Sequence, residues 1–261
     1  MRRPAALALI ALLVSLATAA ITFGENDEGR HPYVGSIVLD YQGFKFQLCS
    51  GTLVSSTVFV TASHCLAGLE DFPIYVSFDE VIDADADGLV DLGVALHSGM
   101  GHAHPLFGLP GADDTHDVGV FILDQPLIMA RYGQLPTAGL LDSTQKQTAR
   151  FTTVGYGTVR DDKTHSFQSF ELGTRRKMVT QDLLALTKAW AQFSMNPSNG
   201  SGGTCFGDSG GPHFLGAGAN ETPIVVAVTV TGDRFCRATD KTYRLDTPAA
   251  REFLGQFLTL P

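Results

Sequence analysis

The chain has 261 residues, with 28 glycines and a formal net charge of −9 from 27 acidic and 18 basic residues. This length is enough for one large domain, or two small ones, with a real buried core. The acidic balance and the lack of a Lys/Arg cluster argue against a nucleic acid or an anionic membrane surface as the partner.

The first 20 residues have the pattern of a secretory signal peptide. Arg2 and Arg3 precede the uncharged run AALALIALLV (5–14), and small residues follow in SLATAA. The apolar stretch is short for a membrane span of about 20 residues. We therefore expect residues 1–20 to be removed, leaving a secreted, extracellular protein with no membrane segment. Cleavage after Ala19 and after Ala20 both fit the small-residue rule, and only the second leaves Ile21 first.

Short β-rich runs bounded by turn residues make up most of the remaining chain. They are residues 33–41, 49–62, 74–78, 118–123, 151–159, 224–232 and 242–246. Many short strands at this spacing predict a β-sandwich or β-barrels. The segment RYGQLPTAGLLD (131–142) is the best candidate for the connection between two halves.

Two segments have helical features. DLLALTKAWAQF (182–193) contains many helix-forming residues. DTPAAREFLGQFL (246–258) has the stronger pattern, because Thr247 can cap a helix and Pro248 suits its first turn. The sequence therefore predicts a mainly β protein that ends in a helix.

The chain has four cysteines, Cys49, Cys65, Cys205 and Cys236. An even number in an exported chain predicts two disulfides, although four cysteines allow three pairings. No CxxC spacing occurs, which argues against a zinc site. Pairing each cysteine with its neighbour in sequence would close loops of about 16 and 31 residues. Each such disulfide would stabilise the fold by about 2–4 kcal/mol.

Three segments carry residues suited to nucleophilic catalysis: TASHC around His64, HDVGV around Asp117 and GGTCFGDSGGP around Ser209. A serine hydroxyl becomes a good nucleophile when a histidine takes its proton, and a buried carboxylate can orient that histidine. Gly207 allows a tight turn, so that its N–H and that of Ser209 could point together at a developing oxyanion. These residues predict an acyl-transfer site.

The order His, Asp, Ser, with cysteines beside His64 and Ser209, resembles the chymotrypsin/trypsin family of serine proteases. TASHC is similar to the family's TAAHC, DVGVFIL to its DIALL segment, and GDSGGP is identical to its nucleophile motif. Only Asp117 among the neighbouring acidic residues precedes the VGV strand as the motif requires. The similarity extends from ITFG (21–24) to the terminal helix, which is most of the chain after the leader.

The resemblance implies an all-β fold of two six-stranded antiparallel β-barrels with a C-terminal α-helix. It places the protease domain at 21–261, with the first barrel at about 21–135, the second at about 136–246 and the helix at about 247–258. His64 and Asp117 would then come from the first barrel and Ser209 from the second. The resemblance also implies disulfides Cys49–Cys65 and Cys205–Cys236.

A further implication concerns Asp208, directly before the nucleophile. In the family, a new Ile-Val-Gly-Gly amino terminus folds inward and pairs with that aspartate, which orders the oxyanion loop. Here ITFG keeps the Ile and the last Gly but differs at the second and third positions. We hypothesise that cleavage after Ala20 itself creates the Ile21 ammonium that pairs with Asp208. If the mature chain starts elsewhere, Asp208 needs another donor.

The resemblance also locates the primary specificity pocket, at Gly203, Thr204, Val230, Gly232 and Lys241. Gly203 stands where an aspartate would select Arg or Lys, so trypsin-like specificity is not expected. Thr231, on the wall strand, replaces a tryptophan that the family often has. Lys241 falls where the family usually has a pocket-lining glycine. It could fill the pocket, attract an acidic side chain or, if the loop is shifted, lie in solvent, so the preferred substrate side chain stays open.

The segment DADADGLVD (83–91) resembles the start of a calcium-binding loop. Asp83, Asp85 and Asp87 occupy alternate positions before a turn glycine, about where the family has its calcium loop. An EF-hand would need Glu where Val94 stands, and a solvated acidic hairpin tip is the alternative interpretation. No cofactor is required for the predicted chemistry, and a structural calcium is the only one that the sequence suggests.

The leading interpretation is a secreted, monomeric serine endopeptidase that hydrolyses protein or peptide substrates through an acyl-enzyme intermediate. The alternative is a catalytically silent binding protein on the same scaffold, although such relatives usually lose a triad residue and this chain keeps all three. An esterase-like hydrolase is a third interpretation, which would share the nucleophile.

Overall fold

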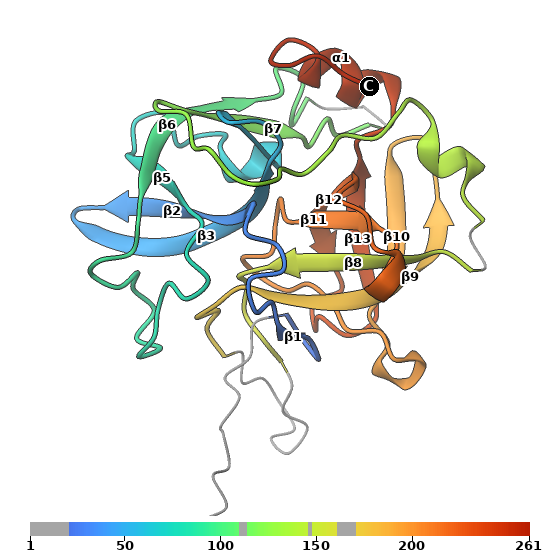
Figure 1. Ribbon diagram of the computed structural model, residues 1–261, viewed down its shortest axis with the longest axis horizontal. Coiled ribbons are helices and arrows are strands. Elements are labelled where there is room, and N and C mark those ends of the chain that lie inside the picture. Colours follow the sequence, from blue (N-terminus) through green and yellow to red (C-terminus); the bar gives the residue numbers. More distant parts are fainter. Residues whose placement is uncertain (1–20, 110–113, 146–147, 161–170) are drawn as a thin grey trace, which may run out of the picture.

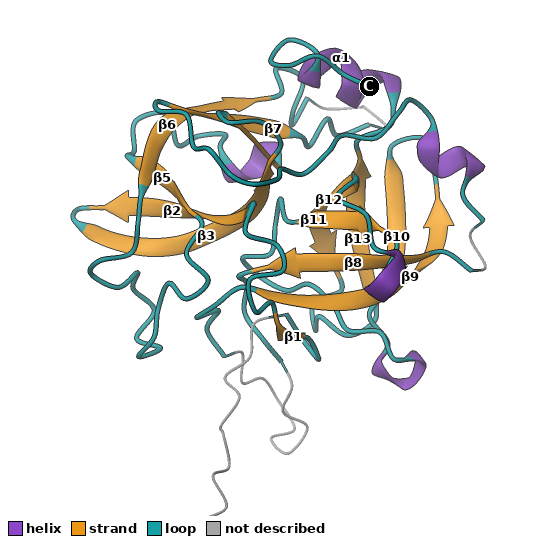
Figure 2. Cartoon of the chain, in the orientation of Figure 1, coloured by secondary structure: helices purple, strands orange, loops and turns teal. Residues whose placement is uncertain are grey.

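The computed structural model describes residues 21–109, 114–145, 148–160 and 171–261. The predicted signal peptide, residues 1–20, lies outside the described residues. Two β-barrels stand next to each other, and the C-terminal end lies with helix α1 (Pro248–Leu254) at one end of the molecule (Figure 1 and Figure 2). No helix in the described part of the chain has the length and apolar character needed to cross a membrane.

The first barrel is closed by six antiparallel strands in the order β2-β3-β4-β7-β6-β5. Their bounds are β2 Val34–Tyr41, β3 Phe44–Leu53, β4 Val58–Thr61, β5 Ile74–Ser77, β6 His97–Ala103 and β7 Gly119–Leu123. Phe59 and Phe121 fill its interior and are fully buried. Gly51 allows β3 to pass over the Phe59 ring, because a Cβ there would lie only 2.4 Å from a ring carbon.

The second barrel has the strand order β9-β10-β13-β12-β11-β8 and is closed by the pairing of β8 with β9. Its strands are β8 Arg150–Gly155, β9 Lys177–Leu186, β10 Trp190–Ser194, β11 Pro212–Leu215, β12 Val225–Gly232 and β13 Thr239–Arg244. Phe151 and Phe193 meet edge to face in its core, with ring centres 5.0 Å apart. The prediction of two six-stranded antiparallel barrels with a C-terminal helix is therefore confirmed.

Residues 22–26 pair with the second barrel, whereas the sequence interpretation counted them with the first. Strand β1 (Glu25–Asn26) is antiparallel to the start of β9, and Thr22 forms an isolated bridge with Gly203. The chain therefore begins on one barrel and crosses to the other before β2. This crossing places the start of the described chain beside the loop that carries Ser209.

The prediction of a helix at 182–193 is wrong. This segment forms the end of β9, a turn and most of β10, and its two arms pair with each other, for example Leu186 with Ala191. Leu183 is buried and Leu184 exposed, which is the two-residue alternation of a strand. Pairing on both sides within a closed barrel outweighs the weak helix propensity of these residues.

The terminal helix occupies Pro248–Leu254, and the Thr247 hydroxyl accepts a hydrogen bond from the Ala250 amide as an N-cap. Four short 3-10 turns complete the secondary structure of the described residues. They are Ser63–Cys65, Leu140–Ser143, Pro197–Asn199 and Gly218–Asn220. The second lies in the connection between the barrels.

Two disulfides, Cys49–Cys65 and Cys205–Cys236, confirm the pairing of neighbouring cysteines. The first connects β3 to the 3-10 turn that carries His64. The second connects the segment before Ser209 to the loop between β12 and β13. Each cross-link therefore restrains a segment that bears one of the candidate catalytic side chains.

Candidate active site

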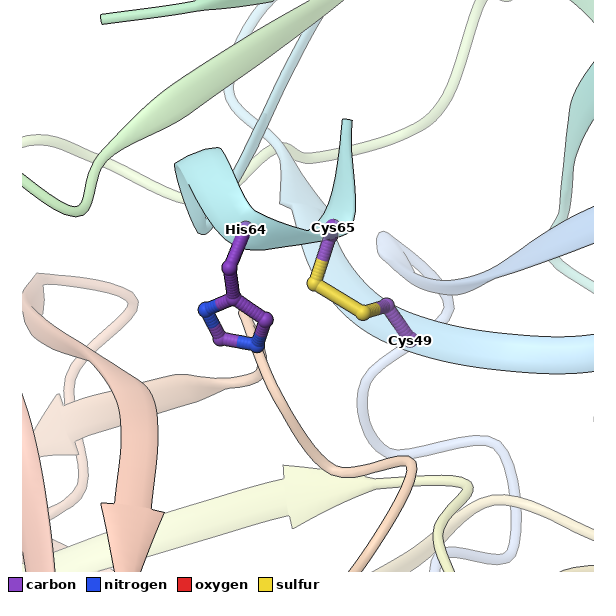
Figure 3. A group of neighbouring side chains, drawn as sticks. All are labelled: Cys49, His64 and Cys65. Atoms are coloured by element: carbon purple, nitrogen blue, oxygen red, sulfur yellow. A yellow bond between two sulfur atoms is a disulfide. The ribbon is translucent and has the colours of Figure 1, made fainter. Parts of the chain in front are cut away.

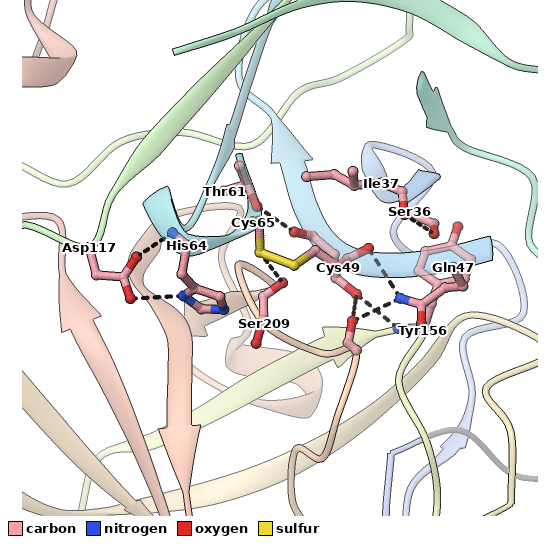
Figure 4. The surroundings of a disulfide bond; sticks show 12 residues. Ser36, Ile37, Gln47, Cys49, Thr61, His64, Cys65, Asp117, Tyr156 and Ser209 are labelled. Carbon is pink, nitrogen blue, oxygen red and sulfur yellow. Dashed lines mark hydrogen bonds and ion pairs between the residues drawn. A yellow bond between two sulfur atoms is a disulfide. The ribbon is translucent and has the colours of Figure 1, made fainter. Parts of the chain in front are cut away.

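The side chains of His64 and Asp117 lie in contact on the first barrel. His64 Nδ1 is 2.8 Å from Asp117 Oδ2, and the His64 amide donates to Asp117 Oδ1 over 2.9 Å (Figure 4). Asp117 is only 3% exposed, so its carboxylate is held by both bonds away from water. This arrangement favours the tautomer with the proton on Nδ1, which leaves Nε2 free to act as a base.

Ser209 lies on the other side of His64 from Asp117 (Figure 4). It comes from the second barrel, in the turn before β11, and its carbonyl accepts the Ser50 amide of the first barrel over 2.7 Å. Its hydroxyl makes no hydrogen bond to any residue that the structure describes. The three predicted residues thus meet where the two barrels join, with the serine oxygen available for reaction.

Gly207 has the backbone geometry that an oxyanion-binding turn needs. Its φ is +92°, and a Cβ there would lie 2.4 Å from Gln47 Oε1, so only glycine fits without strain. Its carbonyl accepts hydrogen bonds from Gln47 Nε2 at 2.9 Å and Ser50 Oγ at 3.1 Å. Within the described residues, the amides of Gly207 and Ser209 donate to no protein acceptor. Both donors are therefore available to a developing oxyanion.

Asp208 lies between Gly207 and Ser209 in sequence, and its side chain is fully buried. Its carboxylate accepts the Gly157 amide at 2.7 Å and the Cys205 amide at 2.8 Å. Burial, with a smaller contribution from the charge of Asp240, raises the pKa of Asp208 to about 7 despite these bonds. No ion pair to Asp208 occurs among the described residues, so at neutral pH this carboxyl group lacks a cationic partner.

Two glycines that the sequence analysis missed make room for Asp208. A Cβ on Gly155 would lie 2.2 Å from Asp208 Oδ1, and one on Gly157 would lie 2.6 Å from Oδ2. The Gly-Tyr-Gly sequence at the end of a predicted strand was the available signal, since glycine in a strand often marks close approach of another backbone or group.

The start of the described chain lies against the same loop. Ile21 is fully buried, and Thr22 exchanges two backbone hydrogen bonds of 2.9 Å with Gly203, five residues before Asp208. Ile21 is thus near the segment that it is expected to order. The ion pair between an Ile21 ammonium and Asp208 stays a prediction.

Comparison with known proteins agrees with this geometry. The family model described as Trypsin matches residues 21–251, which is most of the chain. The chain belongs to the trypsin family of serine proteases.

A solved structure of a collagenase, described as HL collagenase, is similar with a TM-score of 0.64. The two chains are 14% identical, and the similarity covers 91% of this chain and 97% of the collagenase. At this identity the likeness supports the two-barrel trypsin fold and carries no information about the substrate.

A cavity of about 140 Å³ opens beside Ser209 in this trypsin-family chain. Thr204, Val230 and Gly232 line it, as predicted for the primary pocket, and the ring of Phe206 lines it too while remaining 59% exposed. Phe206 was not singled out from the sequence. Its position directly before Gly207 places an aromatic ring next to the oxyanion donors.

Gly203 and Lys241 do not line this cavity. A Cβ on Gly203 would lie 2.0 Å from the sulfur of Met195, so the position predicted for the pocket base is packed by a buried methionine. Lys241 Nζ lies 4.0 Å from the centre of the Trp190 ring, a cation–π contact that directs its charge elsewhere. Of the alternatives for Lys241, the one in which it neither fills the pocket nor attracts an acidic side chain matches this geometry.

Phe206 also lines a second cavity, of about 240 Å³. Gln47 and Gly207 line it together with apolar side chains. The apolar members are Leu48, Ile82, Leu89, Val90, Leu172 and Phe206. Phe206 is therefore shared between two cavities that flank the oxyanion segment.

Cys49, Cys65 and His64 also come close together (Figure 3). Both sulfurs belong to one disulfide, so neither can supply the thiolate that a transition metal needs. His64 is instead engaged by Asp117. The geometry of this group therefore fits catalysis by His64 and not a metal centre.

The acidic loop brings carboxylates together in a different combination from the predicted one. Oxygen atoms of Asp83, Asp85 and Asp91 lie within 4.8 Å of one another, and Asp87 does not belong to this group. All four carboxylates accept backbone amides of the loop. Asp83 is only 4% exposed, and its burial raises its pKa. A buried carboxylate beside two others fits a hard divalent cation, with Asp91 replacing Asp87 in the expected set.

We predict that Ca²⁺ binds these carboxylates and raises the melting temperature. Asp83→Asn should abolish the rise, because it removes the buried negative charge, while the exposed Asp71→Asn should preserve it. Thermal unfolding with Ca²⁺ and with EGTA measures both. An unfolding curve that is the same under the two conditions would leave a solvated acidic turn as the interpretation.

Proposed function

We propose that this trypsin-family protein is a secreted serine endopeptidase that acts as a monomer on protein or peptide substrates. Ser209 is the nucleophile, His64 the general base and Asp117 the residue that orients it. The main support is the double hydrogen bond between Asp117 and His64, which leaves Nε2 directed away from the carboxylate and towards the side of Ser209. The chemistry of these side chains needs no cofactor.

In the proposed mechanism, Ser209 Oγ attacks the substrate carbonyl carbon while His64 Nε2 takes the hydroxyl proton. The negative charge that develops on the carbonyl oxygen is stabilised by the N–H groups of Gly207 and Ser209. Asp117 stabilises the imidazolium. His64 then gives its proton to the departing amine, leaving an acyl group on Ser209. In the second half of the reaction, water attacks the acyl carbon while His64 takes its proton, and His64 returns that proton to Ser209 Oγ as the acid leaves.

The primary specificity is proposed to be for an uncharged side chain of small to moderate size. The cavity beside Ser209 has threonine, valine and glycine on its walls, and Met195 packs under Gly203. The only lysine predicted to line it contacts Trp190 instead. Asp233 and Arg234 also line the cavity, but the Asp233 carboxylate already accepts four backbone amides of its own loop. A buried Arg or Lys side chain would therefore find no carboxylate free to compensate its loss of hydration.

The test of the enzyme hypothesis is labelling of the protein by a fluorophosphonate probe. We expect the probe to attach to Ser209, Ser209→Ala to abolish labelling, and Asp117→Asn to lower kcat by about 10⁴-fold because the wrong tautomer of His64 is then favoured. Ser198→Ala, in a surface turn, is the matched control. A correctly processed protein that is not labelled would support the silent binding protein instead.

Cleavage of a peptide library will test the primary specificity. We expect cleavage after uncharged side chains, with Arg and Lys poorly used at the same position. Gly203→Asp alone should not create trypsin-like cleavage, because Met195 occupies the space that its side chain needs. Preferred cleavage after Arg or Lys by the unchanged protein would contradict the proposed pocket.

The hypothesis that leader cleavage also activates the enzyme predicts different pH behaviour for two forms of the chain. Without a cation, Asp208 takes up a proton on folding, because its pKa is about 7 in the fold and 3.8 otherwise. The free energy of unfolding then falls as pH rises from about 4 to about 7. An Ile21 ammonium should lower the pKa of Asp208 and remove this loss.

Amino-terminal sequencing combined with probe labelling tests this hypothesis. Protein beginning at Ile21 should be active, and protein beginning at Ala20 should be only weakly labelled and should show the fall in stability. A fully active enzyme whose stable first residue is Ala20 would show that the direct-activation hypothesis is wrong.

A further inference from the structure

A second histidine, His31, lies between two carboxylates away from the catalytic residues. Its Nδ1 contacts Asp27 Oδ1 closely, and its Nε2 is 2.6 Å from Glu221 Oε1. The His31 ring is 1% exposed and stacks on Phe214, with ring centres 5.2 Å apart. Asp27 precedes the first barrel, whereas Glu221 belongs to the loop between β11 and β12 of the second. His31 therefore connects the crossing segment to the second barrel.

The hydrogen-bonding geometry determines the charge of His31. A neutral imidazole has one N–H and one lone pair, so it can donate to only one of two carboxylates. Here both ring nitrogens face carboxylate oxygens, and only the imidazolium donates to both. Arg176 Nε also contacts Asp27, at 2.8 Å. With His31 protonated, the two carboxylates and two cations balance; without the proton, a buried group carries one uncompensated negative charge.

The direction of each pKa shift agrees with this assignment. Burial opposes the charge on His31, but its bonds to Asp27 and Glu221 outweigh burial and raise its pKa above the usual value. Burial likewise acts against ionised Asp27, yet the bond and charge of His31 and the charge of Arg176 lower its pKa to about 2. Burial acts against ionised Glu221 too, but the bonds from His31 and Thr152 together with the charges of His31 and Arg30 outweigh it and lower its pKa.

A chain of hydrogen bonds leads from this group to the oxyanion segment. Arg176 donates to Tyr156 Oη at 2.9 Å, and the Tyr156 amide donates to Ser50 Oγ at 3.1 Å. Ser50 Oγ in turn donates to the Gly207 carbonyl at 3.1 Å. The residue after Tyr156, Gly157, donates its amide to Asp208. Arg176 is thus linked through Tyr156 to the Gly207 carbonyl and the Asp208 carboxylate, both of which lie between the two proposed oxyanion donors in sequence.

We propose that His31, held as an imidazolium by Asp27 and Glu221, is a positioning residue for the oxyanion segment. It acts through Arg176 and Tyr156, and through the segment from residue 21 to 31 that it attaches to the second barrel. This inference rests on the proposed protease function for its effect on activity, but the protonation of His31 stands independently of that function.

The proton on His31 has a defined effect on pH dependence. Because the pKa of His31 is raised in the fold, its contribution to stability is full below its unfolded pKa and is lost as pH rises through the folded pKa. The contribution of ionised Asp27 to stability is lost only as pH falls towards its pKa of about 2. Among the described residues, the other charged or titratable groups around this group include Arg176, Arg30, Arg131, Tyr156 and Tyr33, and burial raises the pKa of Tyr33 to about 12 and that of Tyr156 further. As pH rises, deprotonation of His31 is therefore the first change expected to disrupt this group of charges.

The variant Glu221→Gln tests whether the proton on His31, or only its contact with residue 221, is needed. A glutamine amide can donate to the Nε2 lone pair, so neutral His31 would keep both neighbours: its Nδ1–H donates to Asp27 and its Nε2 accepts from Gln. The variant should lower the pKa of His31 and make the network insensitive to deprotonation. Glu252→Gln, an exposed position on α1, is the matched change in charge.

The first measurement is the protonation of His31 by NMR in protein carrying Ser209→Ala, which has no protease activity of its own. We expect an imidazolium through neutral pH, a midpoint shifted to lower pH by Glu221→Gln, and no shift with Glu252→Gln. A His31 that titrates at or below its usual pKa, or a midpoint that Glu221→Gln does not lower, would overturn the proposal.

The second measurement is the pH profile of kcat/KM with Ser209 intact. We expect activity to fall on the alkaline side as His31 loses its proton, and Glu221→Gln to move this fall to higher pH. If His31 served folding alone, Glu221→Gln would lower kcat/KM at every pH without moving its alkaline fall. An alkaline fall at an unchanged pH would therefore overturn the positioning role. Absence of activity together with a protonated His31 would instead overturn the proposed protease function.

Discussion

Two backbone amides, those of Gly157 and Cys205, hold the Asp208 carboxylate in a place from which water is excluded. A carboxylate buried in this way fixes residue 208, and its two neighbours in sequence, Gly207 and Ser209, carry the proposed oxyanion donors. The space for it depends on Gly155, the last residue of β8, and on Gly157, and its loop is cross-linked by Cys205–Cys236. The reactive geometry at Ser209 therefore depends on how this one acidic group is satisfied.

Two of the histidine–aspartate pairs in the described part of the chain, His64–Asp117 and His31–Asp27, have opposite consequences. His64 contacts Asp117 through Nδ1 and is partly exposed, and no second carboxylate faces its Nε2 among the described residues. That nitrogen can therefore accept a proton. His31 contacts Asp27 through Nδ1 and Glu221 through Nε2, so its proton is needed for the buried contacts. The number of carboxylates, and not the histidine itself, decides between a base and a fixed cation.

The surroundings of the proposed substrate site follow the same electrostatic logic. The charge of Lys241 is directed away from the primary pocket by its contact with Trp190, and the base position is packed by Met195. Apolar side chains form much of the wall of the second cavity that contains Phe206, whereas threonines, Asp233 and Arg234 line much of the cavity beside Ser209. Burial of apolar surface would therefore govern binding at the second cavity more than at the first.

The sequence by itself determined the trypsin-family motifs and most strands, because these depend on local spacing and on residue types that few other chemistries require. It left three cysteine pairings open, and the family resemblance implied the one that the structure has. It identified Gly207 from the turn at GDSGGP, and its φ of +92° follows from that turn. Only the tertiary structure decided that residues 182–193 form a hairpin, because closure of the barrel gives both arms strand partners. It likewise decided where Lys241 points, why Gly155 and Gly157 face Asp208, and that His31 meets a carboxylate 190 residues away. These features arise from contacts between distant segments, and local sequence patterns do not specify which distant side chain will be the neighbour.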